Sequence, residues 1–300
     1  MPPAHSHNTR QNGVFAILLA SFLWGTTGTA ASFAPLASPM AIGAFAMGIG
    51  GLLQALLAYR HLWHDWPGLR ANPALVLTGA LAVAIYPLAF YSSMRFAGVS
   101  TGTVVTIASA PLLTAIIERL FGNHNPMDRR WFVSLMLGIS GILLLAHPGD
   151  QEQLPSTDSQ HRFGIILGLV AGFTYALYSW IAVRLIQRGV RSQSAMAGLF
   201  VPASLILLGS LGFTGDQLFA TPSASLAVWY ISLIPMFLGY VLFGYGLRHI
   251  DASRATLLTL FEPVVAAFMA VFVVGETITW YGWLGAGLIG ICLLIQTRKA

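Results

Sequence analysis

The sequence predicts an all-α integral membrane protein, with ten transmembrane helices in two inverted five-helix repeats. Three observations support this fold class: an apolar composition, ten apolar runs of membrane-spanning length, and basic residues that concentrate in alternate loops. Of the 300 residues, 56% are hydrophobic and 8% are charged, and the mean hydropathy is +0.73. A soluble globular chain carries about 25% charged residues. The composition therefore excludes an ordinary water-soluble domain, and it equally excludes intrinsic disorder, which needs low hydrophobicity and high net charge.

The apolar runs set the predicted helices. A helix needs about 20 apolar residues to cross a bilayer, and runs of this length cover about 13–32, 39–59, 74–95, 100–121, 131–147, 163–186, 193–213, 224–247, 252–273 and 279–297. Strands of a membrane β-barrel would instead be alternating segments of about 10 residues. Because unpaired backbone amides are costly in hydrocarbon, the uninterrupted runs are predicted to be helices. The connections are short, and the two longest are predicted at 60–73 and 148–162.

The first run is predicted to be a retained helix. Residues 1–12 are polar and lack the basic stretch that begins a signal peptide, and Trp24-Gly25-Thr26-Thr27 is a poor cleavage site.

The basic residues predict the orientation. All 15 Lys and Arg residues except Arg95 and Arg162 fall in the N-terminus, in alternate loops or at the C-terminus. Because positive charge stays cytoplasmic, both termini are predicted to be cytoplasmic, and the protein is expected in the inner (cytoplasmic) membrane. The pI of 9.7 has the same origin. The basic residues are scattered between apolar runs and form no patch, so no nucleic-acid partner is expected.

An internal duplication divides the chain. The polar connection at 148–162 separates two halves of the sequence that match at offsets of 149 to 153 residues. Since each half has five helices, the second copy enters the membrane in the opposite orientation, an arrangement found in many secondary transporters. The predicted domains are a cytoplasmic N-terminus (1–12), a first repeat (13–147), an extracytoplasmic linker (148–162), a second repeat (163–297) and a cytoplasmic C-terminus (298–300). The matched segments are Phe22-Leu23-Trp24 with Phe173-Thr174-Tyr175, Arg95 with Arg248, Pro111 with Pro263, and Gly138–Gly141 with Gly287–Gly290.

Several motifs, in this order, resemble the EamA-type modules of the drug/metabolite transporter superfamily. They are Ala20-Ser21-Phe22-Leu23-Trp24-Gly25-Thr26, Phe261-Glu262-Pro263-Val264, Gly275-Glu276 and Gly285-Ala286-Gly287-Leu288-Ile289-Gly290. The resemblance covers the whole chain as two modules, and in detail the chain is similar to the bacterial aromatic amino-acid exporters of that superfamily. The first module departs from the pattern, because Ala110-Pro111 stands where the second has Glu262-Pro263.

The resemblance implies a secondary transporter that exports aromatic and other neutral amino acids, or similar small amphiphilic metabolites, by alternating access. Multidrug efflux, nucleotide-sugar exchange and a passive channel or facilitator stay open as alternatives. The expected partners are a small-molecule substrate, an amino acid, and the lipid bilayer. The oligomeric state is not indicated, and a monomer is plausible.

Glu262 is the one ionisable residue near the centre of a predicted span, whereas Glu118 lies toward the cytoplasmic end of its span. Charged residues at this depth are candidates for function. Pro263 has no N–H, so the carbonyl of Thr259 is expected to lose its helical donor. The carboxyl, this carbonyl and the Thr259 hydroxyl would then bind a substrate ammonium or carry a proton. The alternative is a neutral, structural Glu262.

Two prolines are predicted to kink helices and to serve gating. Pro263 interrupts the ninth span, and Pro111 suggests a matching kink in the fourth span, beside Ser109. The alternative is bending for packing alone.

Deep aromatic residues form the second set of candidates. The deep residues are Trp24, Tyr86, Tyr175, Tyr178 and Tyr240, and a tyrosine hydroxyl facing lipid would lack a partner. Phe90 shares a helix face with Tyr86 by i,i+4 spacing, as Ser179 does with Tyr175. Aromatic walls with hydroxyl tips suit an amphiphilic organic substrate, and burial in a core is the alternative. The transport path is expected between the halves, along spans one, three, four, six, eight and nine.

Small residues recur every four positions on two spans, a pattern that lets helix backbones approach closely. They are Gly164, Gly168, Gly172 and Ala176 on the sixth span, and Gly282, Ala286 and Gly290 on the tenth.

No metal, cofactor or catalytic site is expected. The single cysteine, Cys292, excludes a disulfide framework and a cysteine-based metal site, and the chain has no HExxH or P-loop motif. Gly138-Ile139-Ser140-Gly141 is similar to the nucleophile setting of rhomboid-type intramembrane proteases. A serine nucleophile needs a base within reach, and all eight histidines lie in loops or near span ends. The chain is therefore predicted not to be an enzyme.

Overall fold

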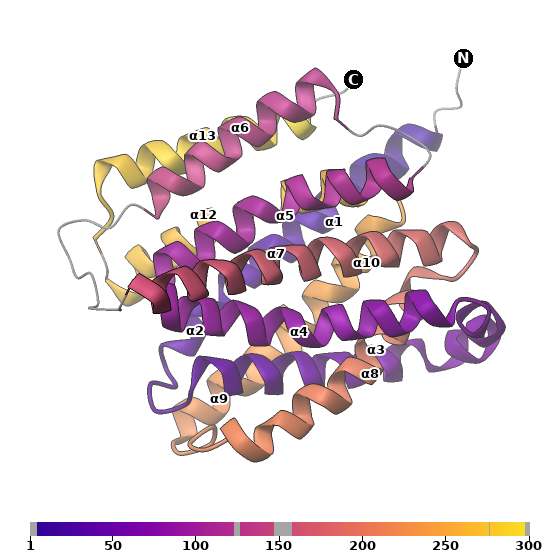
Figure 1. Ribbon diagram of the computed structural model, residues 1–300, viewed down its shortest axis with the longest axis horizontal. Coiled ribbons are helices and arrows are strands. Elements are labelled where there is room, and N and C mark those ends of the chain that lie inside the picture. Colours follow the sequence, from indigo (N-terminus) through magenta and orange to yellow (C-terminus); the bar gives the residue numbers. More distant parts are fainter. Residues whose placement is uncertain (1–4, 123–126, 147–157, 276, 298–300) are drawn as a thin grey trace.

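The computed structural model describes residues 5–122, 127–146, 158–275 and 277–297. Every regular element in these ranges is helical, which confirms the predicted fold class (Figure 1). The helices of the first repeat are α1 (His5–Gly25) with α2 (Thr27–Ala31), α3 (Pro39–Arg70), α4 (Pro73–Ala97), α5 (Val99–Phe121) and α6 (Arg129–Leu145).

The second repeat follows the same order, with two of its spans built from several pieces. The helices are α7 (Asp158–Gln187); α8 (Ser192–Thr214); α9 (Pro222–Ile231), the π-helical η1 (Ser232–Gly239) and α10 (Tyr240–Leu247); α11 (Ala252–Leu258), α12 (Phe261–Met269) and the π-helical η2 (Ala270–Val274); and α13 (Trp280–Thr297).

The predicted spans correspond to these helices. In the described part of the chain, nine helical stretches have the length and hydropathy to cross a membrane. The remaining helix, α6, has 17 residues, at the lower limit for a membrane-spanning helix. The fold therefore provides ten membrane-length segments.

The two longest predicted connections are shorter in the structure. Helix α3 continues through the predicted loop at 60–73 as far as Arg70 and has 32 residues. Polar residues lower the hydropathy there, but no residue before Arg70 ends the helix, and Trp63 and Trp66 are exposed. At the other connection, α7 begins at Asp158, so its first residues belong to the helix and not to the linker. The rest of the predicted linker lies outside the described residues.

The helices run back and forth between two ends of the bundle (Figure 1). The start of α1 and the end of α13 lie at the same end, together with the α3–α4, α7–α8 and α10–α11 connections. We call this the arginine-rich end, because it carries Arg10, Arg70, Arg130, Arg188 and Arg254. Its predicted cytoplasmic orientation stays a prediction.

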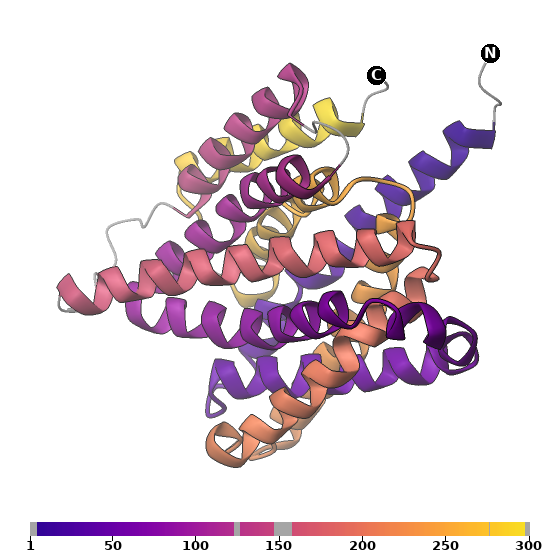
Figure 2. The same cartoon turned by 45° about the vertical axis from the view of Figure 1, so that its right-hand side comes forward.

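The repeats interlock. Helix α1 packs on α10 and α12, and its counterpart α7 packs on α4 and α5, so the first helix of each repeat lies against the third and fourth spans of the other. Helices α3 and α8 form one edge of the bundle and α6 and α13 the other (Figures 1 and 2). This exchange of packing partners places the core between the two halves.

Glycine makes the closest of these contacts. A Cβ atom at Gly25 would lie 2.8 Å from the Glu262 carbonyl oxygen, and one at Gly172 would lie 2.9 Å from the Thr106 carbonyl oxygen. Small residues at these positions let the backbones approach. Gly164 and Gly168 likewise face α4 and α5, so the predicted packing role of the α7 stripe is confirmed.

The stripe predicted on α13 is only partly a contact face. Gly282 is buried, but Gly290 faces open space. The contact with α6 instead uses Gly285 and Ile289, which lie against Gly141. Because α6 crosses α13 along positions 282, 285 and 289, the face follows a different helical row from the one predicted.

Candidate functional site

The ninth span breaks one turn before its centre. Helix α11 ends at Leu258 and α12 begins at Phe261. The carbonyl oxygen of Thr259 accepts a hydrogen bond from the amide of Glu262 at 3.0 Å. The prediction of a free carbonyl at Thr259 is therefore wrong. Pro263 has no N–H to donate to the Thr259 carbonyl. The backbone therefore turns more tightly here, and the Glu262 amide, one residue earlier, donates instead.

The Thr259 hydroxyl joins the ninth span to α7, the first helix of the same repeat. It donates to the carbonyl oxygen of Thr256 at 2.7 Å and accepts from the Tyr175 hydroxyl at 3.0 Å. Thr259 and Tyr175 are both buried. The break in the ninth span thus determines where the Tyr175 ring lies.

Aromatic side chains from five spans meet beside this break. We call them the aromatic cluster: Trp24, Tyr86, Phe90, Tyr175, Tyr178, Phe200, Tyr240 and Phe243. Ring centroids lie 4.8 Å apart for Trp24 and Tyr240, 5.6 Å for Tyr86 and Tyr175, and 5.9 Å for Tyr86 and Phe90. Such distances are typical of attractive aromatic pairs.

Hydrogen bonds hold the polar tips of Trp24, Tyr175, Tyr178 and Tyr240. The indole Nε1 of Trp24 donates to the carbonyl oxygen of Pro235 at 3.0 Å, and the hydroxyls of Tyr178 and Tyr240 lie 3.2 Å apart. Pro235 belongs to the π-helical η1, and such wide turns occur often at functional sites. The rings are thereby fixed in orientation.

Glu262 lies next to the cluster and remains partly exposed inside the bundle. Among the described residues, its carboxylate has no hydrogen-bond or ion-pair partner. It lies within electrostatic range of the hydroxyls of Tyr86, Tyr91, Tyr175 and Tyr240. A carboxylate surrounded by aromatic rings and hydroxyls, on three different spans, can receive a cationic group.

Several predicted residues lie elsewhere. The Ser109 hydroxyl donates to the Thr106 carbonyl oxygen at 3.2 Å and faces Gly172, on the interface between α5 and α7. Ser179 is fully buried, and within the described ranges its hydroxyl has no partner. Pro111 is buried in α5, which continues unbroken past it. Of the two prolines, only Pro263 therefore lies beside a helix interruption.

Two groups of residues were not found from the sequence. Tyr91, next to Phe90 on α4, lies near Glu262, and Phe200 and Phe243 complete the cluster. Phenylalanine carries no polar tip, so nothing in the sequence distinguishes these two from lipid-facing residues.

Glu118 makes a polar contact between the repeats. It was placed near the membrane interface, but only 3% of its surface is exposed. Its Oε1 accepts from the Ala252 amide at 2.8 Å, and one turn away the Thr256 hydroxyl donates to the Thr114 hydroxyl oxygen at 3.3 Å. The sequence feature that could have indicated this contact is an acidic residue on an otherwise apolar helix.

Comparison with known proteins identifies this architecture. The model of the EamA-like transporter family matches residues 11–146 and 162–297. "Uncharacterized transporter YwfM" of Bacillus subtilis (strain 168) is 31% identical over 287 residues, covering 93% of this chain and 91% of that protein. "Uncharacterized inner membrane transporter YedA" of Escherichia coli (strain K12) is 28% identical, covering 95% of this chain and 90% of that protein.

A solved crystal structure shares the fold. It superposes with a TM-score of 0.77 at 17% identity and covers 94% of this chain and 95% of the other. The matches of the family model account for both repeats, and a transporter of this kind has a small-molecule substrate and lies in a lipid bilayer. The chain belongs to the EamA-like transporter family, within the drug/metabolite transporter superfamily.

Proposed function

We propose that this transporter exports aromatic and other neutral amino acids, or similar small amphiphilic metabolites, across the cytoplasmic membrane by alternating access. The observation that carries the proposal is the Glu262 carboxylate, which has no hydrogen-bond or ion-pair partner in the described part of the chain and lies beside the aromatic cluster. The substrate ammonium would bind Glu262, and the substrate side chain would pack against the rings.

The chemistry of the site supports an ammonium ligand. A charged acceptor forms stronger hydrogen bonds than a neutral one, and aromatic faces attract cations. The cluster also offers apolar area for an aromatic or aliphatic side chain. Ligand sites of this kind combine apolar walls with few polar groups that orient the ligand.

Tyr91 lies between the site and a cavity at the end opposite the arginine-rich end. A cavity of about 510 Å³ lies there, at the start of α3 and the ends of α4 and α8. It is lined by Tyr91, Met94, Arg95 and Asp216, and Tyr91 also lies within electrostatic range of Glu262. At the arginine-rich end, the contact between Glu118 and Ala252 joins α5 to α11. This asymmetry supports a state that is closed at one end, as alternating access requires.

The interlocked repeats support the same mechanism. Each first helix packs against the third and fourth spans of the other repeat. Two similar units of opposite orientation can exchange their arrangements, opening first one end and then the other.

A panel of radiolabelled amino acids in proteoliposomes tests the proposal. We expect labelled aromatic and neutral amino acids to accumulate by counterflow against unlabelled substrate. Liposomes without protein are the control. Equilibration without counterflow would indicate a channel, and accumulation of organic cations but of no amino acid would indicate drug efflux; either result would overturn the proposal.

A further inference from the structure

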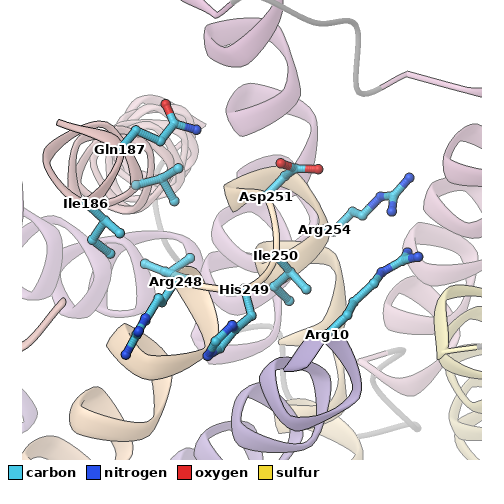
Figure 3. Close-up of a pocket in the computed structure, with 10 residues that line it drawn as sticks. Arg10, Ile186, Gln187, Arg248, His249, Ile250, Asp251 and Arg254 are labelled. Carbon is cyan, nitrogen blue, oxygen red and sulfur yellow. The ribbon is translucent and has the colours of Figure 1, made fainter. Parts of the chain in front are cut away.

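A second polar cavity lies at the arginine-rich end. It has a volume of about 200 Å³. The side chains come from the start of α1, the end of α7 and the connection between α10 and α11 (Figure 3). We call it the arginine pocket; its polar lining residues are Arg10, Gln187, Arg248, His249, Asp251 and Arg254.

Positive charge in the pocket exceeds negative charge. Arg10 lies within electrostatic range of two like charges, on Arg254 and Arg130, and of one opposite charge, on Asp251. Arg254 also forms an ion pair with Asp128, at a long distance of 3.7 Å. The lining of the pocket thus has three guanidinium groups and one carboxylate, that of Asp251.

Several donors in the pocket are available. Within the described ranges, the guanidinium groups of Arg10 and Arg248 have no hydrogen-bond or ion-pair partner. The Nε2 atom of His249 is buried and also lacks a partner there. Guanidinium groups offer donors in a fork that matches the two oxygens of a carboxylate, so the pocket is suited to an oxyanion.

Two helices that line the pocket also carry residues of the aromatic cluster. Its apolar lining includes Val183 on α7 and Leu247 on α10. Val183 is five residues beyond Tyr178, about 7.5 Å along a helix at about 1.5 Å per residue. Leu247 is one turn beyond Phe243, which packs on Trp24. The arginine pocket and the cluster therefore lie along the same two helices, with the pocket nearer the arginine-rich end.

We propose that the arginine pocket is a loading site that binds the carboxylate of the amino-acid substrate before its ammonium reaches Glu262. This inference rests on the proposed function. The carboxylate of the zwitterionic substrate then binds first, in the arginine pocket, and its ammonium binds later, at Glu262 beside the cluster. An excess of positive charge at the mouth also raises the local concentration of anionic groups.

Transport from the arginine-rich side tests the pocket. In vesicles of defined orientation, Arg10→Gln and Arg248→Gln are each expected to raise KM about tenfold for an amino acid that the wild type carries, with little change in kcat. The corresponding amino-acid amide, which has no carboxylate, should show no such change. Arg119→Gln is the matched control, because Arg119 is exposed on α5 at the same end and does not line the pocket. Equal KM values for wild type and both pocket variants would overturn the inference.

A binding measurement separates this inference from the proposed function. At constant ionic strength, sodium acetate should raise the Tm of the detergent-solubilised wild type above its value in sodium chloride, and Arg10→Gln should abolish the rise. If this occurs although the wild type transports no amino acid, the function fails and the carboxylate site stands. If acetate has no effect that depends on Arg10, the site fails.

Two further probes distinguish the sources of an oxyanion. A rise in Tm with inorganic phosphate but not with acetate would overturn the assignment to a carboxylate. Stabilisation that depends on Arg10 only in nanodiscs containing phosphatidylglycerol, and not in phosphatidylcholine with acetate, would assign the pocket to a lipid headgroup and overturn the loading site.

Discussion

The carboxylate of Glu118 accepts a hydrogen bond from the backbone amide of Ala252, the first residue of α11, at 2.8 Å. A negative charge at a helix N-terminus is favourable, because the first amides of a helix lack partners within it. At the offset that relates Pro111 to Pro263, the counterpart of Glu118 is Ala270 in η2. In the described part of the chain, the two ends of the pseudo-symmetric bundle are therefore chemically different, and this carboxylate–amide contact occurs at the arginine-rich end only.

Replacing Glu118 is expected to loosen the arginine-rich end. Glu118→Ala leaves the Ala252 amide without its partner, at a cost of about 1–3 kcal/mol. In a Cys292→Ala background, a cysteine at the buried position Ser253 should then react faster with an impermeant thiol reagent than it does when Glu118 is present. A cysteine at Ser194, which is also fully buried near that end, is the control. Equal reactivity of a cysteine at position 253 with and without Glu118 would show that the Glu118–Ala252 contact does not hold this end closed.

Replacing the central acid is expected to weaken transport without abolishing it. Glu262→Gln keeps the shape of the side chain but removes the charge that binds the ammonium. Hydrogen bonds to charged groups are worth about 1.5–3 kcal/mol, or about 10- to 100-fold in affinity. Both exchange and downhill transport should therefore require higher substrate concentrations. Complete loss of both, in a well-folded variant, would contradict the expectation and make the charge essential for the transport cycle.

The aromatic cluster can be divided into ring and hydroxyl contributions at Tyr175. Tyr175→Phe removes the hydrogen bond to Thr259 and should cost about 0.5–1.5 kcal/mol of folding free energy, with most transport retained. Tyr175→Ala and Tyr86→Ala remove a ring beside Glu262 and should reduce transport strongly while the proteins stay monodisperse in detergent. Tyr59→Ala, at a tyrosine that is 50% exposed, is the control. Normal transport by both ring-deletion variants would assign these tyrosines to the core.

Close approach of α7 and α5 is expected to depend on Gly172. A methyl group there would lie 2.9 Å from the Thr106 carbonyl oxygen and closer still to the Ser109 hydroxyl. Overpacking of this kind costs about 1–3 kcal/mol, so Gly172→Ala should lower the Tm. Gly287→Ala is the matched control, since a Cβ atom at Gly287 would meet nothing within 4 Å. A Tm for Gly172→Ala equal to that of the control would mean that the helices can separate at little cost.

The orientation in the membrane can be measured with single cysteines. After replacement of Cys292, a cysteine at Ser38 should react with an impermeant reagent added outside the cell, because Ser38 lies at the end opposite the arginine-rich end. A cysteine at Arg188, at the arginine-rich end, should react only after permeabilisation. Labelling of the Arg188 position from outside would overturn the predicted cytoplasmic location of both termini.

The sequence by itself determined the membrane class, the spans and the internal duplication. These features depend on averages over many residues: hydropathy over about 20 positions, and arginine counts over alternate loops. One error in a single residue changes neither. The central acid was also visible, because an ionisable residue within an apolar run is rare.

The ends of individual helices and their hydrogen bonds were less predictable. The helix at 60–70 continues although hydropathy falls there, because hydropathy reports burial in lipid and not helix formation. The Thr259 carbonyl finds a donor because a small change of backbone path brings the Glu262 amide to it. Sequence spacing alone cannot show such a rearrangement.

Tertiary structure alone decided which side chains meet. Tyr86, Tyr175 and Tyr240 come from three spans and gather at one place, whereas the Ser109 hydroxyl faces a helix contact. Ser179 is fully buried, and its hydroxyl has no partner among the described residues. Glu118 is buried and bonded to the Ala252 amide because α11 begins beside the end of α5. Periodicity states which face of a helix a residue occupies. What that face touches depends on the crossing of helices from opposite repeats, which is set by packing across the whole bundle.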